Sequence, residues 1–237
     1  RQMCIRDSIW IAESDDFAEP DFLASCVEQL DREPSCTLAY TESRLVDAES
    51  HPMKKRMKKA YSRGEVCDMW EGNAFIIANM LRCNTIYNAS MVVFRKDARP
   101  TNEAYKKYRY VGDWLFWVGI LLNGDAVYID KPLDYFRQHG KNTTSKSIST
   151  GNNYKEMAHL MQDICRQVNP PRGFKLFLYG RFLVRIKRLH KGIEYRHDTI
   201  EEIYDYWGDI QNPLTAIVWY RLAKILHIYR DEKPYMP

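Results

Sequence analysis

Carboxylates gather near the start of the chain, in the run Glu13-Ser14-Asp15-Asp16. The apolar residues 9–12 before them predict the end of a buried strand, and Pro20 with Asp21 predicts the start of a helix. Open α/β sheets bind their ligands at the carboxyl ends of such strands. Clustered carboxylates repel one another unless a cation lies between them, and their oxygen atoms suit Mg2+ or Mn2+. The run therefore predicts a divalent-metal site, and the alternative is a solvated acidic turn that caps the helix.

A second candidate for chemistry is Asp113, in the sequence Val-Gly-Asp-Trp-Leu-Phe-Trp that ends at Trp117. The apolar residues after it predict a helix that runs to about Leu122. Asp113 then lies in the first helical turn, where the helix dipole favours an anion. Such a carboxylate is either an N-cap residue or a general base that removes a proton from an acceptor hydroxyl.

A third candidate segment follows a short expected strand and reads Lys131-Pro-Leu-Asp-Tyr-Phe-Arg-Gln-His-Gly140. Its Arg137 and His139 are separated by one residue. A guanidinium and a neutral imidazole placed together can serve a diphosphate and a metal ion. The alternative is that both residues belong to the ordinary surface or core.

These three segments, in this order, resemble family 2 glycosyltransferases, which have the GT-A fold. The acidic run resembles their metal-binding DxD segment, Gly112-Asp113 resembles the position that supplies the base, and the segment ending at His139 resembles their closing motif. The resemblance covers roughly residues 9–142. Two departures are Glu13, where the family more often has Asp, and Gly112, which replaces an acidic residue.

The resemblance implies a role for each matching residue. Asp15 and Asp16 would hold Mg2+ or Mn2+ on the diphosphate of a nucleotide sugar, with His139 as a third ligand or a phosphate contact. Arg137 would neutralise charge on the leaving group, and Glu13 is also assigned to donor binding. Asp113 would be the catalytic base.

The function implied is a metal-dependent, inverting transferase that moves a sugar from a nucleotide-sugar donor to a hydroxyl of a glycan or lipid-linked acceptor, as in cell-surface polysaccharide synthesis. Family members carry nucleotide-binding βαβ units before the acidic motif, and we expect the chain to lack that N-terminal part. The alternative is a non-catalytic interaction or membrane-surface module derived from such an enzyme. A metal-dependent phosphohydrolase is a third class, but the sequence offers no second carboxylate-rich shell for it.

The elements that must position these residues follow from apolar spacing. We expect a partial GT-A-like, Rossmann-like mixed α/β sheet with flanking helices, followed by a helical C-terminal region. Residues 1–8 show no periodicity and are expected to be non-native or disordered, 9–150 form the glycosyltransferase portion, and 151–237 form the helical extension. Within the second of these segments we expect helices over 21–30, 70–82 and 112–122 and strands over 36–46, 91–94 and 126–129.

In the C-terminal region, spacing predicts helices over 154–168, 174–191, 199–207 and 213–228. The helix Phe174 to Lys191 has an apolar face and a basic face. Such a helix either makes peripheral contact with an anionic membrane or packs on the domain as an ordinary helix.

Composition excludes several classes. The net charge of the 237 residues is only +4, which gives no indication of a nucleic-acid partner. The 6 cysteines are scattered without metal-ligand spacing and indicate free thiols in a reducing cytosol. No apolar run approaches the roughly 20 residues that cross a bilayer. We therefore expect a cytoplasmic protein, at most peripheral to the inner face of the membrane.

Overall fold

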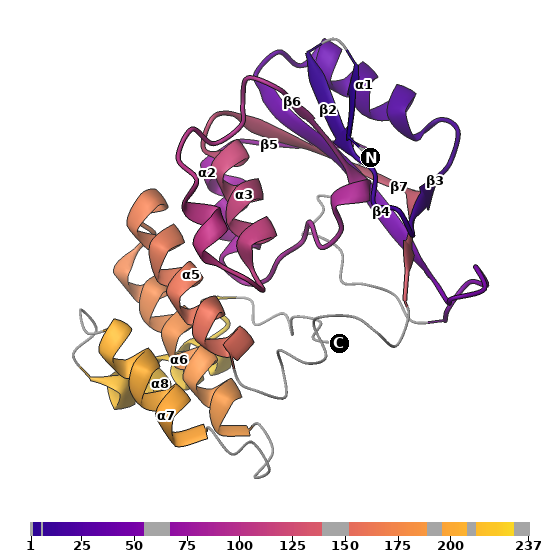
Figure 1. The fold of residues 1–237 in the computed structure, drawn as a ribbon. Coiled ribbons are helices and arrows are strands. Elements are labelled where there is room, and N and C mark those ends of the chain that lie inside the picture. Colours follow the sequence, from indigo (N-terminus) through magenta and orange to yellow (C-terminus); the bar gives the residue numbers. More distant parts are fainter. Residues whose placement is uncertain are drawn as a thin grey trace. The chain divides into compact units, whose positions relative to one another are not determined.

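The computed structural model describes residues 2–5, 7–54, 67–138, 152–188, 196–207 and 212–229 (Figure 1). The chain forms two compact units, one of residues 1–107 with 112–141 and the other of residues 108–111 with 142–237. The first unit contains a mixed sheet with flanking helices, and the second is helical. The predicted fold class, a mixed α/β sheet followed by a helical region, is confirmed.

One mixed sheet forms the centre of the first unit. Its strands are β1 Gln2–Ile5, β2 Ser8–Ile11, β3 Phe17–Ala18, β4 Cys36–Val46, β5 Cys67–Trp70, β6 Val92–Arg95 and β7 Asp125–Arg137. The strand order is β1-β2-β6-β4-β7-β3, and β5 also pairs with β7. β4 and β7 run parallel, whereas the other pairings between these strands are antiparallel. The carboxyl ends of β4 and β7 therefore meet at one edge of the sheet.

β7 is longer than the strand predicted over residues 126–129. Pro132 has no backbone N–H and follows the charged Asp130 and Lys131, so the local pattern indicates an end where the strand continues. The continuation is held by pairing with β4, whose residues from Ser43 to Val46 match Asp134 to Arg137. A register irregularity at Glu42, opposite Pro132, accommodates the proline. Tertiary pairing thus carries polar side chains to the sheet edge.

Helices cover this sheet. They are α1 Phe22–Arg32, α2 Gly72–Phe75, the π-helix η1 Ile76–Met80, the 3-10 helices η2 Ala89–Met91 and η3 Ala104–Lys107, and α3 Gly112–Leu121. α1 buries Phe22, Cys26 and Leu30 against the sheet. The helix predicted over 70–82 is found in a shorter form, from Gly72 to Met80, and it changes from α2 to the π-helix η1 at Ile76. Trp70 instead ends β5, where it pairs with Ala126 of β7.

Residues 1–8 were expected to be non-native or disordered, and the strand at Gln2–Ile5 contradicts only the expected disorder. Gln2–Ile5 forms β1, and the strand pairs antiparallel with β2 in the register Gln2 to Ile11 and Ile5 to Ser8. This pairing extends the sheet beyond β2 with backbone hydrogen bonds, which do not depend on side-chain periodicity.

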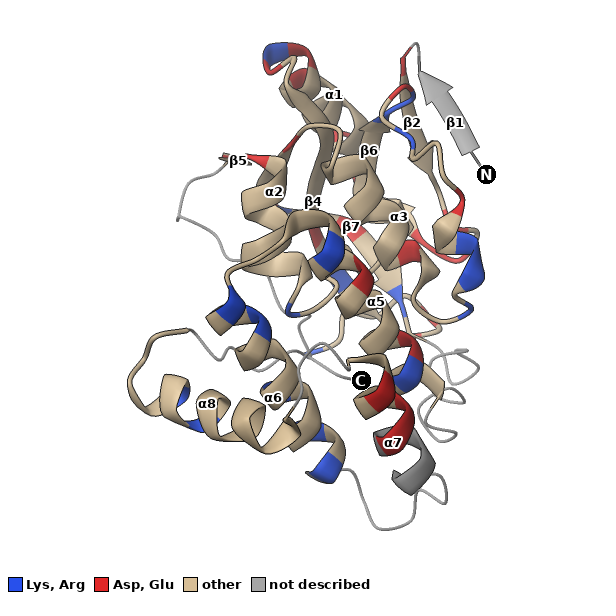
Figure 2. Cartoon of the chain, turned by 90° about the vertical axis from the view of Figure 1, so that its left-hand side faces the viewer, with Lys and Arg blue, Asp and Glu red and all other residues tan. Residues whose placement is uncertain are grey.

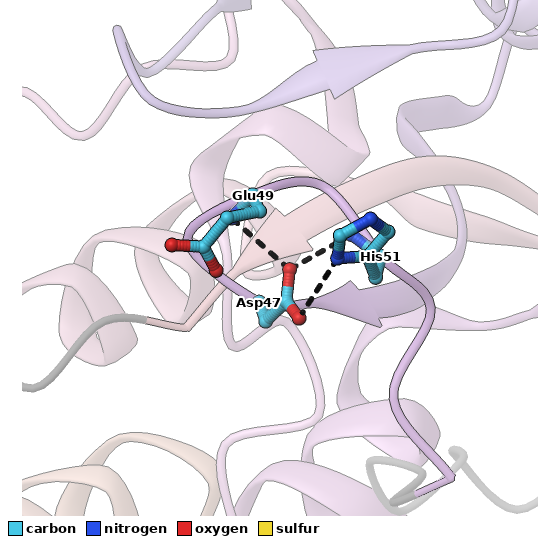
Figure 3. Close-up of side chains that lie close together, drawn as sticks. All are labelled: Asp47, Glu49 and His51. Atoms are coloured by element: carbon cyan, nitrogen blue, oxygen red, sulfur yellow. Dashed lines mark hydrogen bonds and ion pairs between the residues drawn. The ribbon is translucent and has the colours of Figure 1, made fainter.

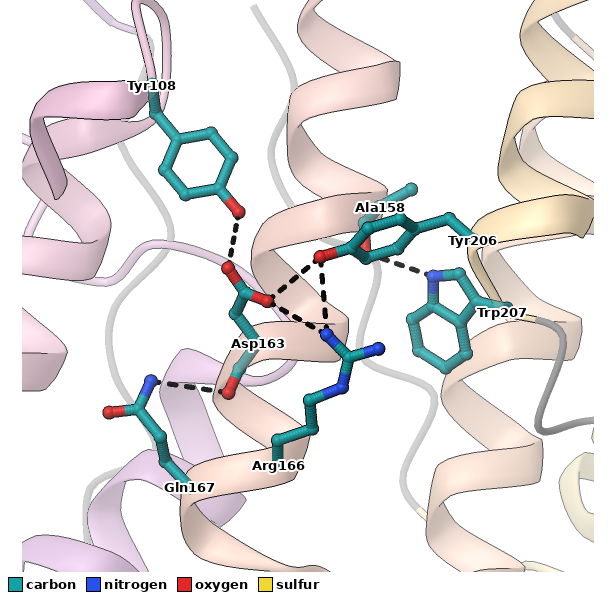
Figure 4. A network of polar contacts seen from close by, with 7 residues as sticks. All are labelled: Tyr108, Ala158, Asp163, Arg166, Gln167, Tyr206 and Trp207. Atoms are coloured by element: carbon teal, nitrogen blue, oxygen red, sulfur yellow. Dashed lines mark hydrogen bonds and ion pairs between the residues drawn. The ribbon is translucent and has the colours of Figure 1, made fainter. Parts of the chain in front are cut away.

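The second unit consists of α5 Asn152–Val168, α6 Arg172–Arg188, α7 Arg196–Tyr206 and α8 Pro213–Ile225. All four helices begin within a few residues of their predicted positions. A polar network around Asp163 of α5 joins this helix to α7 and to the segment 108–111 (Figure 4). Asp163 accepts hydrogen bonds from the hydroxyls of Tyr108 at 2.7 Å and Tyr206 at 3.0 Å, and Arg166 lies 3.4 Å from it. The segment 108–111 thereby belongs to the helical unit.

The apolar face of α6 is buried inside this unit. Phe177, Tyr179 and Ile186 are each at most 1% exposed, and Arg181 of the expected basic face is only 8% exposed. Burial leaves these side chains unable to lie on a membrane surface. The alternative of an ordinary packed helix therefore describes α6, and the side chains of Arg188 and Lys191 lie outside the described residues. Among the described helices, none combines the length and hydropathy needed to span a bilayer.

The close crossing of α6 and α8 gives a first testable prediction. A Cβ added to Gly180 would lie 2.0 Å from the Ala216 carbonyl oxygen and 2.9 Å from Tyr220 Cβ. Alanine gains about 1 kcal/mol in helix propensity over glycine, whereas overpacking a core costs about 1–3 kcal/mol. The added atom would meet backbone, which cannot move aside easily, so the cost of overpacking should exceed the gain in helix propensity. Gly180→Ala should therefore lower the free energy of unfolding in a urea titration. Thr215→Ala, at an exposed position of α8, should leave it nearly unchanged. If Gly180→Ala is as stable as the parent, α6 and α8 do not approach each other as closely at this position as the structure shows.

Candidate active site

The acidic run leaves β2 and is held by Ser90, which lies in η2 before β6. The backbone N–H of Glu13 donates to Ser90 Oγ at 2.9 Å, and this hydroxyl donates to Asp16 Oδ2 at 3.2 Å. Trp10 Nε1 donates to the Ser90 carbonyl at 2.8 Å. The run is thus fixed by contacts across more than 70 residues of sequence, and α1 begins without a side-chain cap from Asp21. A simple helix-capping turn does not describe it.

Arg137, the last residue of β7, joins the acidic run to the sheet edge. Its backbone N–H donates to Asp16 Oδ1 at 2.9 Å and its Nε donates to the Asp15 carbonyl at 2.7 Å. Its Nη1 donates to the carbonyls of Asp47 at 3.2 Å and Ala48 at 2.9 Å. Most of the guanidinium therefore holds the backbone around the site, and only Nη2 has no hydrogen-bond partner among the described residues.

Asp134 is a buried carboxyl at the same edge, with its side chain 0% exposed. Its Oδ2 accepts from Ser43 Oγ at 2.5 Å and from Asn88 Nδ2 at 3.2 Å, while Oδ1 has no side-chain partner among the residues that the structure describes. Burial, with the neighbouring charges of Asp16 and Glu13, raises the pKa of Asp134 to about 7 despite these hydrogen bonds. Asn88 Oδ1 also accepts from the backbone N–H of Ser90, so Asp134 connects to the residue that holds the acidic run.

Burial and nearby negative charge act on Glu13 in the acidic run. Desolvation, followed by the charges of Asp16 and Asp15, raises the pKa of Glu13 to about 7, and Asp113 contributes to the same rise. A cation bound beside the acidic run would relieve the repulsion on Glu13, and oxygen ligands fit Mg2+ or Mn2+. The residues present therefore fit a divalent metal held by Asp15 and Asp16.

Asp113 lies in the first turn of α3, as the sequence predicts. Asp113 is an exposed residue, and Asn84 Nδ2 donates to its Oδ2 at 3.2 Å. Desolvation by the surrounding protein raises the pKa of Asp113 to about 6, although backbone N–H groups and Asn84 oppose the rise. A carboxylate that is accessible, oriented by an amide and more basic than usual has the properties of a general base.

The structure brings together Glu13, Asp15, Asp16 and Arg137 through hydrogen bonds and charge. The charge of Asp113 makes the smallest contribution to the raised pKa of Glu13, and the partner of its side chain is Asn84. His139, the expected third metal ligand, lies outside the described residues. Its role stays a prediction.

The described residues contain one group of three side chains close enough to share an ion, and it is not the predicted set. The group consists of Asp47, Glu49 and His51 in the turn after β4 (Figure 3). Asp47 Oδ1 accepts from the backbone N–H of Glu49 at 3.0 Å and of His51 at 2.8 Å, and His51 Nδ1 lies 3.4 Å from Oδ2. These bonds lower the pKa of Asp47, the hydrogen bond from His51 most of all. An Asx turn of this kind accounts for the group without an ion.

Sequence reasoning did not single out Asp134 or Ser43. Asp134 stands in a segment without clean alternation, and only its pairing across β4 and β7 shows that it is buried. The sequence also shows no specific role for three polar residues that precede a predicted strand, which are Asn84, Asn88 and Ser90. Their partners lie 29, 46 and 74 residues away, a separation that no local spacing reveals.

No protein-family model matches this chain, and no curated protein sequence matches it. Similar folds occur in two crystal structures of S. aureus TarS 1-349. In the complex with UDP-GlcNAc, the TM-score is 0.54 at 12% identity, over 96% of this chain and 70% of that chain. In the complex with UDP, the TM-score is 0.56 at 13% identity, over 94% of this chain and 68% of that chain. Since TarS is a glycosyltransferase, the chain has a glycosyltransferase-like fold.

Proposed function

We propose that the chain is a metal-dependent, inverting glycosyltransferase of the family 2 type. The observation that carries the proposal is the sheet edge at which Ser90 and Arg137 hold the acidic run by hydrogen bonds, on a fold shared with a protein that binds UDP-GlcNAc. The charge of Asp113, 100 residues away in sequence, makes the smallest of the contributions that raise the pKa of Glu13. A transferase needs a cation-binding group for the leaving diphosphate and a base for the acceptor, within reach of one sugar.

The donor is proposed to be a uridine diphosphate sugar. The support is the fold shared with a protein that binds UDP-GlcNAc and UDP. Asp15 and Asp16 would hold Mg2+ or Mn2+, which supplies Lewis-acid stabilisation of the departing diphosphate. The free Nη2 of Arg137 is the group that we expect to contact the diphosphate, because its other donors are occupied by protein carbonyls.

The acceptor is proposed to be a hydroxyl of a glycan or a lipid-linked glycan. Asp113 would take the proton of this hydroxyl while the oxygen attacks the anomeric carbon from the face opposite the diphosphate. One displacement with one base inverts the configuration at that carbon. Asn84, which donates to Asp113 Oδ2, would fix the orientation of the base.

Titration calorimetry tests the proposal on this chain. We expect UDP to bind in the presence of Mn2+ and not in its absence, with an affinity reduced by the expected lack of the family's N-terminal nucleotide-binding units. GDP and dTDP should bind more weakly still. Asp15→Asn together with Asp16→Asn should abolish the Mn2+-dependent part of the affinity, because the metal loses its oxygen ligands.

The matched control is Asp97→Asn, an exposed carboxylate in the same unit, which should bind like the parent. UDP binding that is independent of Mn2+, or unaffected by the double variant, would refute the metal site. No nucleotide binding under any condition would favour a non-catalytic module derived from such an enzyme.

A further inference from the structure

α8 carries an exposed apolar stripe. Leu214, Val218, Leu222 and Ile225 are 67%, 55%, 46% and 70% exposed, and Leu226 and Ile228 continue the stripe beyond the helix. The spacing of the four helical residues, i, i+4, i+8 and i+11, places them on one face. Six of the ten large hydrophobic side chains exposed among the described residues lie in this short segment. Such a concentration marks an interaction surface rather than scattered surface residues.

The stripe is not needed for packing within the helical unit. The opposite face of α8 supplies that packing through Ala216, Ile217, Tyr220 and Ala223, all at most 8% exposed. At Gly180 of α6 the two helices approach so closely that an added Cβ would strike the Ala216 carbonyl. α8 therefore has two apolar faces, one buried against its own unit and one presented to the surroundings.

Charge indicates what the presented face contacts. Arg221 and Lys224 are exposed beside the stripe, and residues 212–229 contain no Asp or Glu. Figure 2 accordingly shows Lys and Arg but no acidic residue on α8, in contrast to α7. A helix that combines exposed apolar residues with cations has the pattern of helices that lie in the interface of an anionic bilayer. A second copy of the chain docked on this face would bring like charges together, which disfavours a symmetric dimer.

We propose that α8 docks the chain on an anionic lipid surface, with the stripe in the acyl boundary and Arg221 and Lys224 at the headgroups. The contact is interfacial and independent of the proposed transfer reaction. It replaces the contact expected of α6, whose apolar face is buried.

Vesicle flotation with the full chain tests this proposal. We expect the protein to float with phosphatidylglycerol–phosphatidylcholine vesicles and to stay behind with phosphatidylcholine alone. Leu222→Gln with Ile225→Gln should abolish flotation. Arg221→Gln and Lys224→Gln should each weaken it about five- to tenfold, since one basic residue contributes about a factor of this size at a charged surface.

The matched control is Leu122→Gln with Met69→Gln, which removes two exposed apolar side chains of the first unit and should leave flotation unchanged. Circular dichroism verifies that each variant is folded. The proposal is overturned if anionic vesicles do not bind the parent chain, or if the α8 variants bind them like the parent. It is also overturned if light scattering shows a parent dimer that the Leu222→Gln, Ile225→Gln pair dissociates, because the stripe would then be a protein interface.

Discussion

Asp113→Asn is expected to lower kcat for sugar transfer by about 10²–10⁴-fold, the usual contribution of a positioned general base. The substitution preserves the shape of the side chain and its contact with Asn84, while it removes the group that accepts the proton. UDP binding with Mn2+ should therefore stay within a few-fold of the parent. A coupled assay of UDP release with a glycan acceptor measures kcat, and calorimetry measures binding.

The pH dependence of transfer by the parent protein provides the control for this interpretation. Desolvation raises the pKa of Asp113 to about 6, and the base is active only when it is deprotonated. We expect kcat/KM to fall about tenfold for each pH unit below this value and to level off above it. The residual activity of Asp113→Asn should lose this acid limb. A variant that retains both the rate and the limb would show that Asp113 is only a residue of the first helical turn.

Asp134→Asn is expected to stabilise the metal-free protein at alkaline pH. Burial raises the pKa of Asp134 from 3.8 to about 7, so the folded state holds a proton that the unfolded state releases. Between these two values the parent loses stability as pH rises, and above about 7 the full cost is present. Three pKa units correspond to about 4 kcal/mol as an upper bound. Asparagine is neutral at every pH and avoids the cost.

Urea unfolding at several pH values measures this effect. The free energy of unfolding of Asp134→Asn minus that of the parent should grow from pH 5 to pH 7 and then remain constant. Asp97→Asn, at an exposed position, should show no such growth. A difference for Asp134→Asn that is independent of pH would mean that the carboxyl is charged in the folded protein throughout this range.

A gain in stability should accompany a loss of function at this position. Asp134 reaches Asp16 through Asn88 and Ser90, and its negative charge lies near the acidic run. A buried charge retained at a cost in stability is typical of functional sites. Asp134 lies near the carboxyl end of β7, close to the acidic run, so its substitution should affect that site as well as stability.

Local sequence determined those helices and strands whose apolar pattern is contained within a few neighbouring residues. The alternation from Cys36 to Val46 gave the bounds of β4, and the apolar spacing after Gly112 gave α3 with Asp113 in its first turn. The four helices of the second unit followed from their 3.6-residue period in the same way. The acidic run was recognisable because its chemistry is carried by adjacent residues.

Only the tertiary structure decided which distant side chains meet, because hydrogen bonds and burial join residues that no local pattern relates. Arg137 looked available for a diphosphate, but most of its donors hold the backbone of residues about 90 to 122 positions away. Asp134 became a buried, basic carboxyl only when β7 continued along β4. α6 and α8 both carry apolar and basic residues in sequence, and packing alone determined that α6 is enclosed while α8 presents its stripe.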